Sequence, residues 1–265
     1  MNRATLVLLF LPALALGAPP EWQQVLSSPE PGPFPNPPAL TARYRLGWMA
    51  VTGGWAEAVL TKPRRDILQL EVTGGSSGVV RKLWKLDATH EAIAQASTLR
   101  PLHIRQVEDY GWDKVITDAA FTDRNVTYLR RHVSSNTATP EKPQEFLFPN
   151  LRDLWTALLY IRSQRLQTGD EYRLVVFPGN CAYLANVRVI GKDIVHVHAG
   201  TFNALKFDIH LQKITPLLGL ESHSKFKRAT AWVSDDENRV LLCVEADIFV
   251  GNVWMELQSV KATGP

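Results

Sequence analysis

The side chains best suited to metal or acid–base chemistry lie in two short stretches of the second half of the chain. His196 and His198 are two residues apart, so on a strand they share one face and could bind zinc. A zinc site needs a third ligand, and none stands in local register. Asp235, Asp236 and Glu237 could form a cation site, but acidic residues between two strands are typical of a turn. We therefore expect no metal site and no cofactor.

Candidate nucleophiles lack recognisable partners as well. The serines within Gly75–Gly78 lie in a loop without an obvious base, and neither cysteine stands in a recognisable motif with a histidine. The glycine-rich stretch Gly74–Gly78 lacks the spacing of a phosphate-binding loop, which indicates a flexible connection. We interpret the protein as non-catalytic, with a hydrolase as a distant alternative.

The two cysteines, Cys181 and Cys243, both lie beside strand-like runs. In an oxidising compartment they could form one disulfide that closes a long loop. They could equally remain two buried thiols that pack as small apolar side chains. Both alternatives stay open.

One amphipathic helix organises the chain around it, and its sequence spans Asn150–Gln164. Its apolar residues recur at the spacing of a single buried helical face, with Asn150 placed to cap the first turn and Asp153 near the positive end of the helix dipole. The solvent face is expected to hold Arg152, Thr156 and Ser163. The predicted buried face consists of Leu151, Leu154, Trp155, Leu158 and Leu159, widened by Ala157, Tyr160 and Ile161.

Strand-like sequences precede and follow this helix. The first half alternates over Leu40–Val51, Trp55–Thr61 and Asp66–Thr73, with a predicted hairpin turn at Gly53-Gly54. A two-turn helix is expected over Val79–Leu86. Three further strands are predicted before the main helix and seven after it. The sequence therefore predicts a mainly β domain, in which a large curved antiparallel sheet or half-open barrel packs around one main helix at about 150–165.

A sheet curved around a helix can form a cavity, and six side chains are candidates to line it. Arg162 stands at the edge of the apolar face, where it could contact the acidic head of a ligand or form a structural ion pair with an acid on the sheet. The aromatic candidates could also be ordinary core residues. The predicted lining is Trp155, Leu158, Leu159, Arg162, Trp48 and Trp232.

The N-terminal residues have the features of a secretory signal. Arg3 precedes an apolar run at Leu6–Leu16, and a small-residue cleavage site ends at Gly17. We predict a signal peptide over 1–17, a short helix and Pro-rich tether over 18–39, and a single β-rich domain over 40–262. The tether contains Pro29–Pro38, with six prolines in ten residues, which favours an extended backbone.

Charge and hydropathy argue against two classes of protein. The formal net charge of +3 and the sparse basic clusters do not fit a nucleic-acid-binding protein. No segment after the signal is long and apolar enough to span a bilayer, so we expect a protein that is not transmembrane.

Several short sequences, taken in order, resemble one bacterial family. They are the apolar helix Leu154–Leu166 with its Thr168-Gly169-Asp170 turn, the hairpin Ala199–Ala204, the Ala231–Asp236 strand and turn followed by Arg239, and the earlier turn Thr98–Pro101. Together they are similar to the "domain of unknown function 3108" family over about 40–260. The resemblance implies an exported protein of a Gram-negative envelope and implies no reaction.

Two functions of different classes follow. The first is a periplasmic binding or carrier protein for a lipid or another apolar or amphipathic ligand, a layout similar to that of periplasmic lipoprotein carriers, which hold acyl chains in a half-open barrel. The second is an envelope structural or assembly protein that contacts a protein partner through exposed sheet edges. An open or filled space between helix and sheet would distinguish them.

Overall fold

The structure is a computed structural model that describes residues 20–133, 142–222, 226–248 and 251–262. The predicted signal peptide lies outside these residues. Within them, one sheet of fifteen strands dominates, and its main path runs β8-β7-β6-β5-β4-β3-β2-β1-β15-β14-β13-β11-β10-β9 with β12 attached to β11. Every paired strand is antiparallel to its neighbour. The prediction of a mainly β protein with a large antiparallel sheet is confirmed.

The element bounds show how regularly the chain alternates between strand and turn. The three helices are α1 (Glu21–Gln24), α2 (Gly78–Leu83) and α3 (Leu154–Ser163). The strands are β1 (Leu40–Trp48), β2 (Val51–Arg64), β3 (Ile67–Ser76), β4 (Asp87–Gln95), β5 (Arg100–Asp109), β6 (Lys114–Phe121), β7 (Asn125–His132), β8 (Gln144–Leu147), β9 (Glu171–Val176), β10 (Tyr183–Val197), β11 (Gly200–Ile214), β12 (Leu220–Ser222), β13 (Phe226–Ser234), β14 (Leu241–Ile248) and β15 (Asn252–Ala262).

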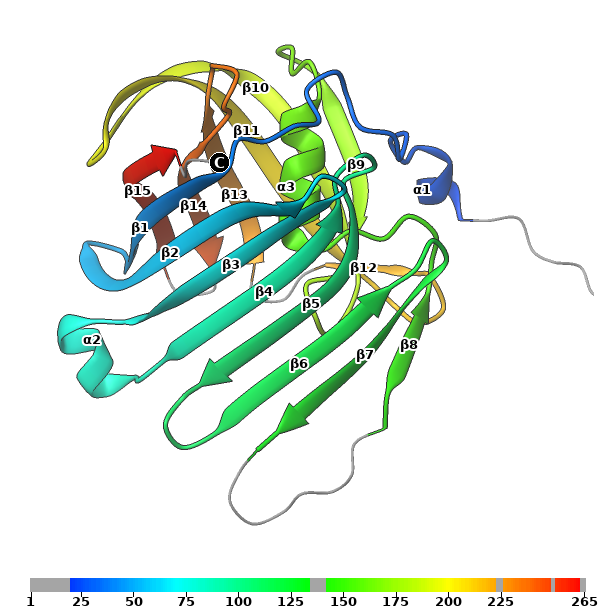
Figure 1. The fold of residues 1–265 in the computed structure, drawn as a ribbon, viewed down its shortest axis with the longest axis horizontal. Coiled ribbons are helices and arrows are strands. Elements are labelled where there is room, and N and C mark those ends of the chain that lie inside the picture. The colour runs from blue at the N-terminus through cyan, green and yellow to red at the C-terminus, as the bar shows by residue number, and fades with distance from the viewer. Residues whose placement is uncertain (1–19, 134–141, 223–225, 249–250, 263–265) are drawn as a thin grey trace, which may run out of the picture.

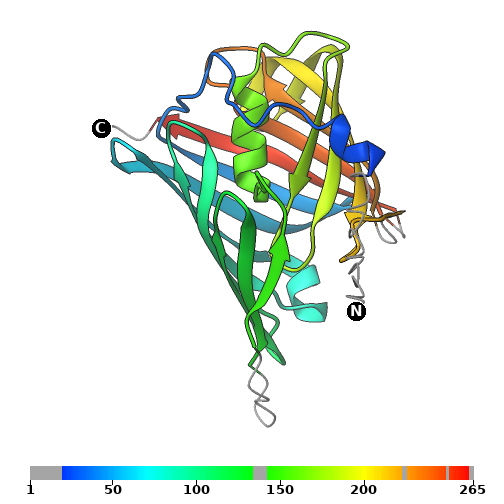
Figure 2. The same ribbon diagram turned by 90° about the vertical axis from the view of Figure 1, so that its right-hand side faces the viewer.

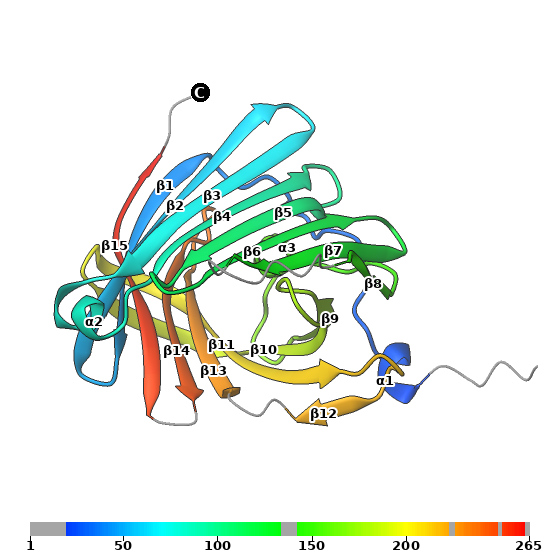
Figure 3. The same ribbon diagram turned by 90° about the horizontal axis from the view of Figure 1, so that it is seen from below.

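The sheet curves around α3. Strands β1–β8 form one wall and β9–β15 the other, and α3 stands between them at one end of the enclosed space (Figures 1 and 2). Seen from below, the two walls are joined through β1 and β15 on the side where α2 lies, and they stand apart on the side of β8 and β12 (Figure 3). A sheet of this length curls because each strand is rotated relative to its neighbour.

The two edges of the sheet meet through a single residue. Arg152 follows β8 and forms a parallel bridge to Val176 of β9, the strand at the other end of the path. Its backbone N–H donates to Val175 O at 3.0 Å, and its carbonyl accepts from Phe177 N–H at 2.7 Å. This bridge satisfies part of the open edge of β9.

Two apolar cores flank α3. Trp155 and Leu159 pack with residues of β2–β7 on one side, whereas Tyr160 and Ile161 pack with β9–β13 on the other. A third cluster joins β1, β13, β14 and β15 to the far end of the β10–β11 hairpin. Helix α3 is therefore packed on both sides.

One turn differs from the prediction. The β1–β2 turn occurs at Met49 and Ala50, and Gly53 and Gly54 lie inside β2. A Cβ at Gly53 would be 2.7 Å from the side chain of Val80 in α2, so this glycine permits a close approach of the helix.

Candidate functional site

The N-terminus of α3 is capped by Asp153, not by the predicted Asn150. The Asp153 carboxylate accepts from the Thr156 N–H at 2.7 Å, and the Thr156 hydroxyl accepts from the Asp153 N–H at 3.0 Å, which forms a capping box. Asn150 has a φ of 56° in the preceding turn. Burial raises the pKa of Asp153, and its second carboxylate oxygen has no partner among the described residues.

Arg152 was predicted to face solvent, but its side chain is buried. The guanidinium donates to the carbonyl of Leu99 at 2.8 Å and to that of Pro29 at 2.7 Å, and it lies 4.3 Å from the ring centre of Tyr160. Burial lowers its pKa to about 10, so the group stays charged at neutral pH. Arg152 therefore joins three separate parts of the chain through one cation.

The Pro-rich segment predicted as a tether lies against α3, and we call residues Leu26–Pro37 the strap. Ser163 Oγ accepts from the Gly32 N–H at 2.9 Å, and its carbonyl accepts from the Phe34 N–H at 3.0 Å. The Tyr160 hydroxyl donates to Ser28 O at 2.7 Å. The strap contacts Ser163, and both Thr156 and Ser163 are buried although they belong to the face predicted to be solvated, whereas Leu154 of the predicted buried face is 59% exposed.

Among the described residues, Arg162 does not form the predicted ion pair with an acid of the sheet. It is buried, and Nη2 donates to the main-chain carbonyl of Asn238 at 3.0 Å. The guanidinium of Arg239 donates to the carbonyls of Arg162 and Gln164 at the end of α3. Burial and the neighbouring Arg239 lower the Arg162 pKa to about 10. The two arginines fix the helix end to the β13–β14 turn.

The six predicted lining residues fall into separate places. Trp155 and Leu159 belong to one core, Leu158 lies beside the second, and Trp232 belongs to the third. Trp48 is 47% exposed at the end of β1. The structure does not gather the six around one cavity.

The remaining chemical candidates also serve local structure. The Nδ1 of His196 is 2.9 Å from the Thr201 hydroxyl, and the His198 N–H donates to Glu256 at 2.6 Å. Asp236 accepts from backbone N–H groups of its own turn, as predicted for that sequence. Across the described ranges, no group of three His, Cys, Asp or Glu side chains could hold a metal ion.

Both cysteines are free thiols in the structure, and both are half-buried instead of fully buried as in the second alternative. Cys181 Sγ lies 3.1 Å from the Tyr183 hydroxyl in the β9–β10 connection. Burial raises the Cys243 pKa to about 12, which keeps that thiol protonated and unreactive at neutral pH.

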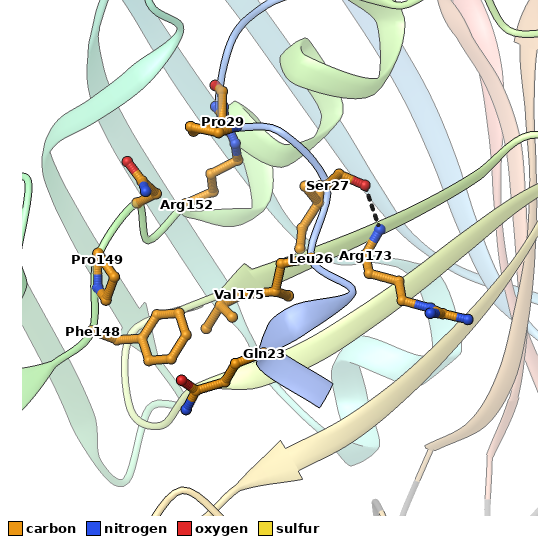
Figure 4. A pocket seen from close by; sticks show the side chains of 11 residues that line it. Gln23, Leu26, Ser27, Pro29, Phe148, Pro149, Arg152, Arg173 and Val175 are labelled. Carbon is orange, nitrogen blue, oxygen red and sulfur yellow. Dashed lines mark hydrogen bonds between the residues drawn. The ribbon is translucent and has the colours of Figure 1, made fainter. Parts of the chain in front are cut away.

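Two small hollows lie beside the segment that leads into α3. The first, of about 170 Å³, is lined by the strap, by β9 and by Phe148–Arg152, and Figure 4 shows the hydrogen bond between Ser27 and Arg173 at its side. The second, of about 280 Å³, lies between Arg100 and Phe121. Both are below the roughly 300–1,000 Å³ of typical ligand pockets, and none of the six predicted residues lines either one.

A different set of side chains, which was not predicted from the sequence, lies on the concave face of the sheet beyond α3. Arg130 of β7, Thr117 of β6, Gln106 of β5 and His90 of β4 are consecutive partners in register, and we call them the polar rung. Each is two or four residues from a core position, so each points inward. The same row continues into apolar side chains at Val72, Ala58 and Ala42 of β3, β2 and β1.

Hydrogen bonds order this rung only in part. Arg130 Nη1 donates to the Thr117 hydroxyl at 3.2 Å, and Nη2 is 3.7 Å from the Glu108 carboxylate. Gln106 donates to the carbonyl of Pro178 at 2.9 Å. The Arg130 side chain remains 33% exposed. A guanidinium in this setting can still accept an acidic partner.

His90 connects the rung electrostatically to α3. Burial lowers the His90 pKa, an effect that the negative charge of Asp153 opposes. The imidazole is therefore neutral at pH 7, when it can both donate and accept a hydrogen bond. Alternation within β5–β7 is visible in the sequence, but the strand β4 and the register between the four strands were not predicted, and both are needed to bring these side chains together.

Comparisons with known proteins identify the fold. The profile of the family described as protein of unknown function (DUF3108) matches residues 42–258. A crystal structure from Brucella abortus, a β-barrel-like protein of domain of unknown function DUF1849, has a TM-score of 0.60 at 10% identity and covers 86% of this chain and 99% of its own. No curated protein sequence matches the chain.

Two further solved structures are less similar. A protein from Bacteroides fragilis, assigned as an exported protein with a YmcC-like fold, has a TM-score of 0.33 at 11% identity over 86% of this chain and 98% of its own. A protein from Parabacteroides distasonis, assigned as a lipoprotein, has a TM-score of 0.34 at 8% identity over 88% and 100%. Among the described residues, no helix is long and apolar enough to cross a membrane.

Proposed function

The chain belongs to the DUF3108 family of proteins of unknown function, and on that premise we propose that it is an exported, non-catalytic protein that binds an amphipathic ligand with an acidic head. The polar rung carries this proposal, because a single inward row changes from Arg130, Thr117, Gln106 and His90 to apolar side chains. An amphipathic molecule has the same two-part chemistry.

The ligand is placed on the concave face beyond α3 and not against the helix itself. Both sides of α3 are occupied by core side chains, so a ligand there would have to displace Trp155 or Tyr160. An alkyl chain along Val72 and Ala58 would gain roughly 0.8 kcal/mol for each CH₂ group removed from water.

The head group is assigned to Arg130. Its contact with Glu108 at 3.7 Å is long for a charge-assisted hydrogen bond, so a carboxylate or phosphate can compete for the guanidinium. The buried Thr117 hydroxyl accepts a hydrogen bond from Arg130 and so holds the guanidinium in place for the head group.

The alternative of a protein that assembles by strand pairing has less support. The edge of β9 is partly occupied, because Ser27 N–H donates to Arg173 O at 3.0 Å and Arg152 pairs with Val175. The other edge, β8, has four residues. Short and covered edges are common protections against edge pairing.

The test is mass spectrometry of lipids extracted from protein purified from the periplasm. We expect an acidic amphiphile with the wild type and its loss from the Arg130→Ala variant. Arg131→Ala is the matched control, because Arg131 is the next residue of the same strand and is exposed on the opposite face. Empty wild-type protein, or equal ligand in both variants, would contradict the proposal.

The same preparation tests export. N-terminal sequencing of the periplasmic protein is expected to begin at Ala18, after cleavage at Gly17. Recovery of the uncut chain from the cytoplasm would refute this part of the proposal.

A further inference from the structure

Exposed apolar side chains gather at the end of the sheet opposite α3, on the β1–β2 turn, α2 and the β5–β6 turn, which together we call the rim. Figures 1 and 3 show α2 beside the β1–β2 hairpin. Leu83 is 85% exposed and Trp112 is 77% exposed. Contiguous exposed apolar surface usually marks an interaction site. The other large apolar side chains exposed there are Met49, Val51, Val79 and Trp84.

The rim is continuous across its three segments. Val80 of α2 packs on Gly53 of β2, and the Ser77 N–H before α2 donates to Gly53 O at 2.9 Å. On the other side, the ring centres of Trp84 and Tyr110 are 6.1 Å apart, and those of Tyr110 and Trp112 are 5.8 Å apart. Contacts therefore connect α2 to both neighbouring hairpins.

Helix α2 contributes nothing to the core, since none of its residues is buried. Polar contacts position it: the Arg81 guanidinium donates to both carboxylate oxygens of Asp87 at 2.7 and 2.8 Å. This pair uses the charge of Arg81. Lys82 is exposed, and Lys85 is exposed but lies 3.9 Å from Asp87 and 4.0 Å from Asp109, at the limit of an ion pair. The helix thus presents apolar side chains and lysines together.

We propose that the rim docks on the surface of an anionic phospholipid bilayer. Tryptophan and tyrosine are the side chains most enriched at the boundary between lipid and water. Lysines beside them are attracted to anionic head groups. The apolar side chains lie on turns and a short helix, which suits shallow insertion into a lipid surface.

Docking of the rim on a membrane is a separate proposal from ligand binding at the polar rung and does not depend on a bound ligand. The rim borders the ends of β3–β6, the strands that carry the polar rung and its apolar continuation. A protein docked in this way holds its concave face open toward the membrane surface, from which an amphipathic molecule would enter.

The test is co-sedimentation of the purified protein with vesicles of phosphatidylethanolamine and phosphatidylglycerol. We expect binding by the wild type and a loss of about tenfold or more in the double variant Leu83→Ser and Trp112→Ser. The matched control is Leu217→Ser, because Leu217 is 93% exposed in the β11–β12 turn, away from the rim. Circular dichroism would show that each variant is folded.

A second variant separates charge from apolar insertion. Lys82→Gln with Lys85→Gln should weaken binding to the anionic vesicles, and vesicles of phosphatidylcholine alone should bind the wild type weakly. Equal binding by the wild type and the rim variant would overturn the proposal. A rim-dependent dimer in sedimentation velocity, without vesicle binding, would overturn it in favour of a second copy of the chain.

Discussion

The concave side of the sheet differs greatly between its two ends. Around α3, even polar and charged side chains such as Thr156 and Arg162 are buried, and the strap packs on Ser163. Beyond α3, Arg130 and His90 face the same side of the same sheet but stay partly exposed. Alternation determines which side chains point inward, whereas burial depends on whether another segment packs against them.

The largest loss of stability is expected from Arg152→Ala in the packed end. The change leaves the carbonyls of Leu99 and Pro29 without their charged donor and removes the contact with Tyr160. We expect the free energy of unfolding to fall by about 4 kcal/mol, measured by urea denaturation. Arg131→Ala, on an exposed site, should change it by less than about 0.5 kcal/mol. Similar values for the two variants would show that the strap contact is dispensable.

A smaller loss is expected from Gly32→Ala in the strap. The new Cβ would lie 2.3 Å from the Ser163 carbonyl oxygen, so the strap must move away from α3. Overpacking of this kind costs about 1–3 kcal/mol. Thermal unfolding measures the loss, and faster limited proteolysis within the strap would locate it. Unchanged proteolysis would mean that the strap accommodates the methyl group in place.

A change in pH dependence is expected from His90→Gln. Burial lowers the His90 pKa below its ordinary value of about 6.5, so the unfolded chain binds more protons than the folded chain between the two values. Wild-type stability therefore falls as the pH drops below about 6.5, and the glutamine variant lacks this contribution. Urea denaturation at several pH values measures it. Parallel stability curves for the two proteins would contradict the assignment.

The smallest effect on stability is expected from Arg130→Ala at the open end. Its contacts are one hydrogen bond and one long ion pair on a partly exposed side chain. We expect a change within about 1 kcal/mol in urea denaturation, together with the loss of bound amphiphile. A loss as large as that of Arg152→Ala would show that Arg130 serves the fold and not a ligand.

Local sequence patterns predicted the strands and the position of the helix well. Periodicity located α3 within the predicted range, and alternation located most strands, because both depend on neighbouring residues. The same periodicity assigned Ser163 to solvent, and it failed there because Gly32 packs on it from 131 residues away. Helical periodicity describes one face and cannot anticipate a second partner on the other.

The candidate site was harder to predict for the same reason. The polar rung exists only when β4, β5, β6 and β7 are aligned in register, and Arg130 and His90 are forty positions apart in the sequence. Each residue taken singly resembles an ordinary polar strand position. The predicted lining does not converge, because Trp155 and Trp232 belong to different cores and Trp48 is exposed at the end of β1.

The pairing of β1 with β15 dictates when this chain can finish folding. Leu40 pairs with Ala262, and Trp22 donates to Leu218 O across 196 residues, so early segments of the described chain depend on late ones. Distant contacts of this kind slow folding. The β1–β15 pair therefore forms only when both of these strands are available, whereas the strap needs only α3 and β9, which lie within residues 154–176.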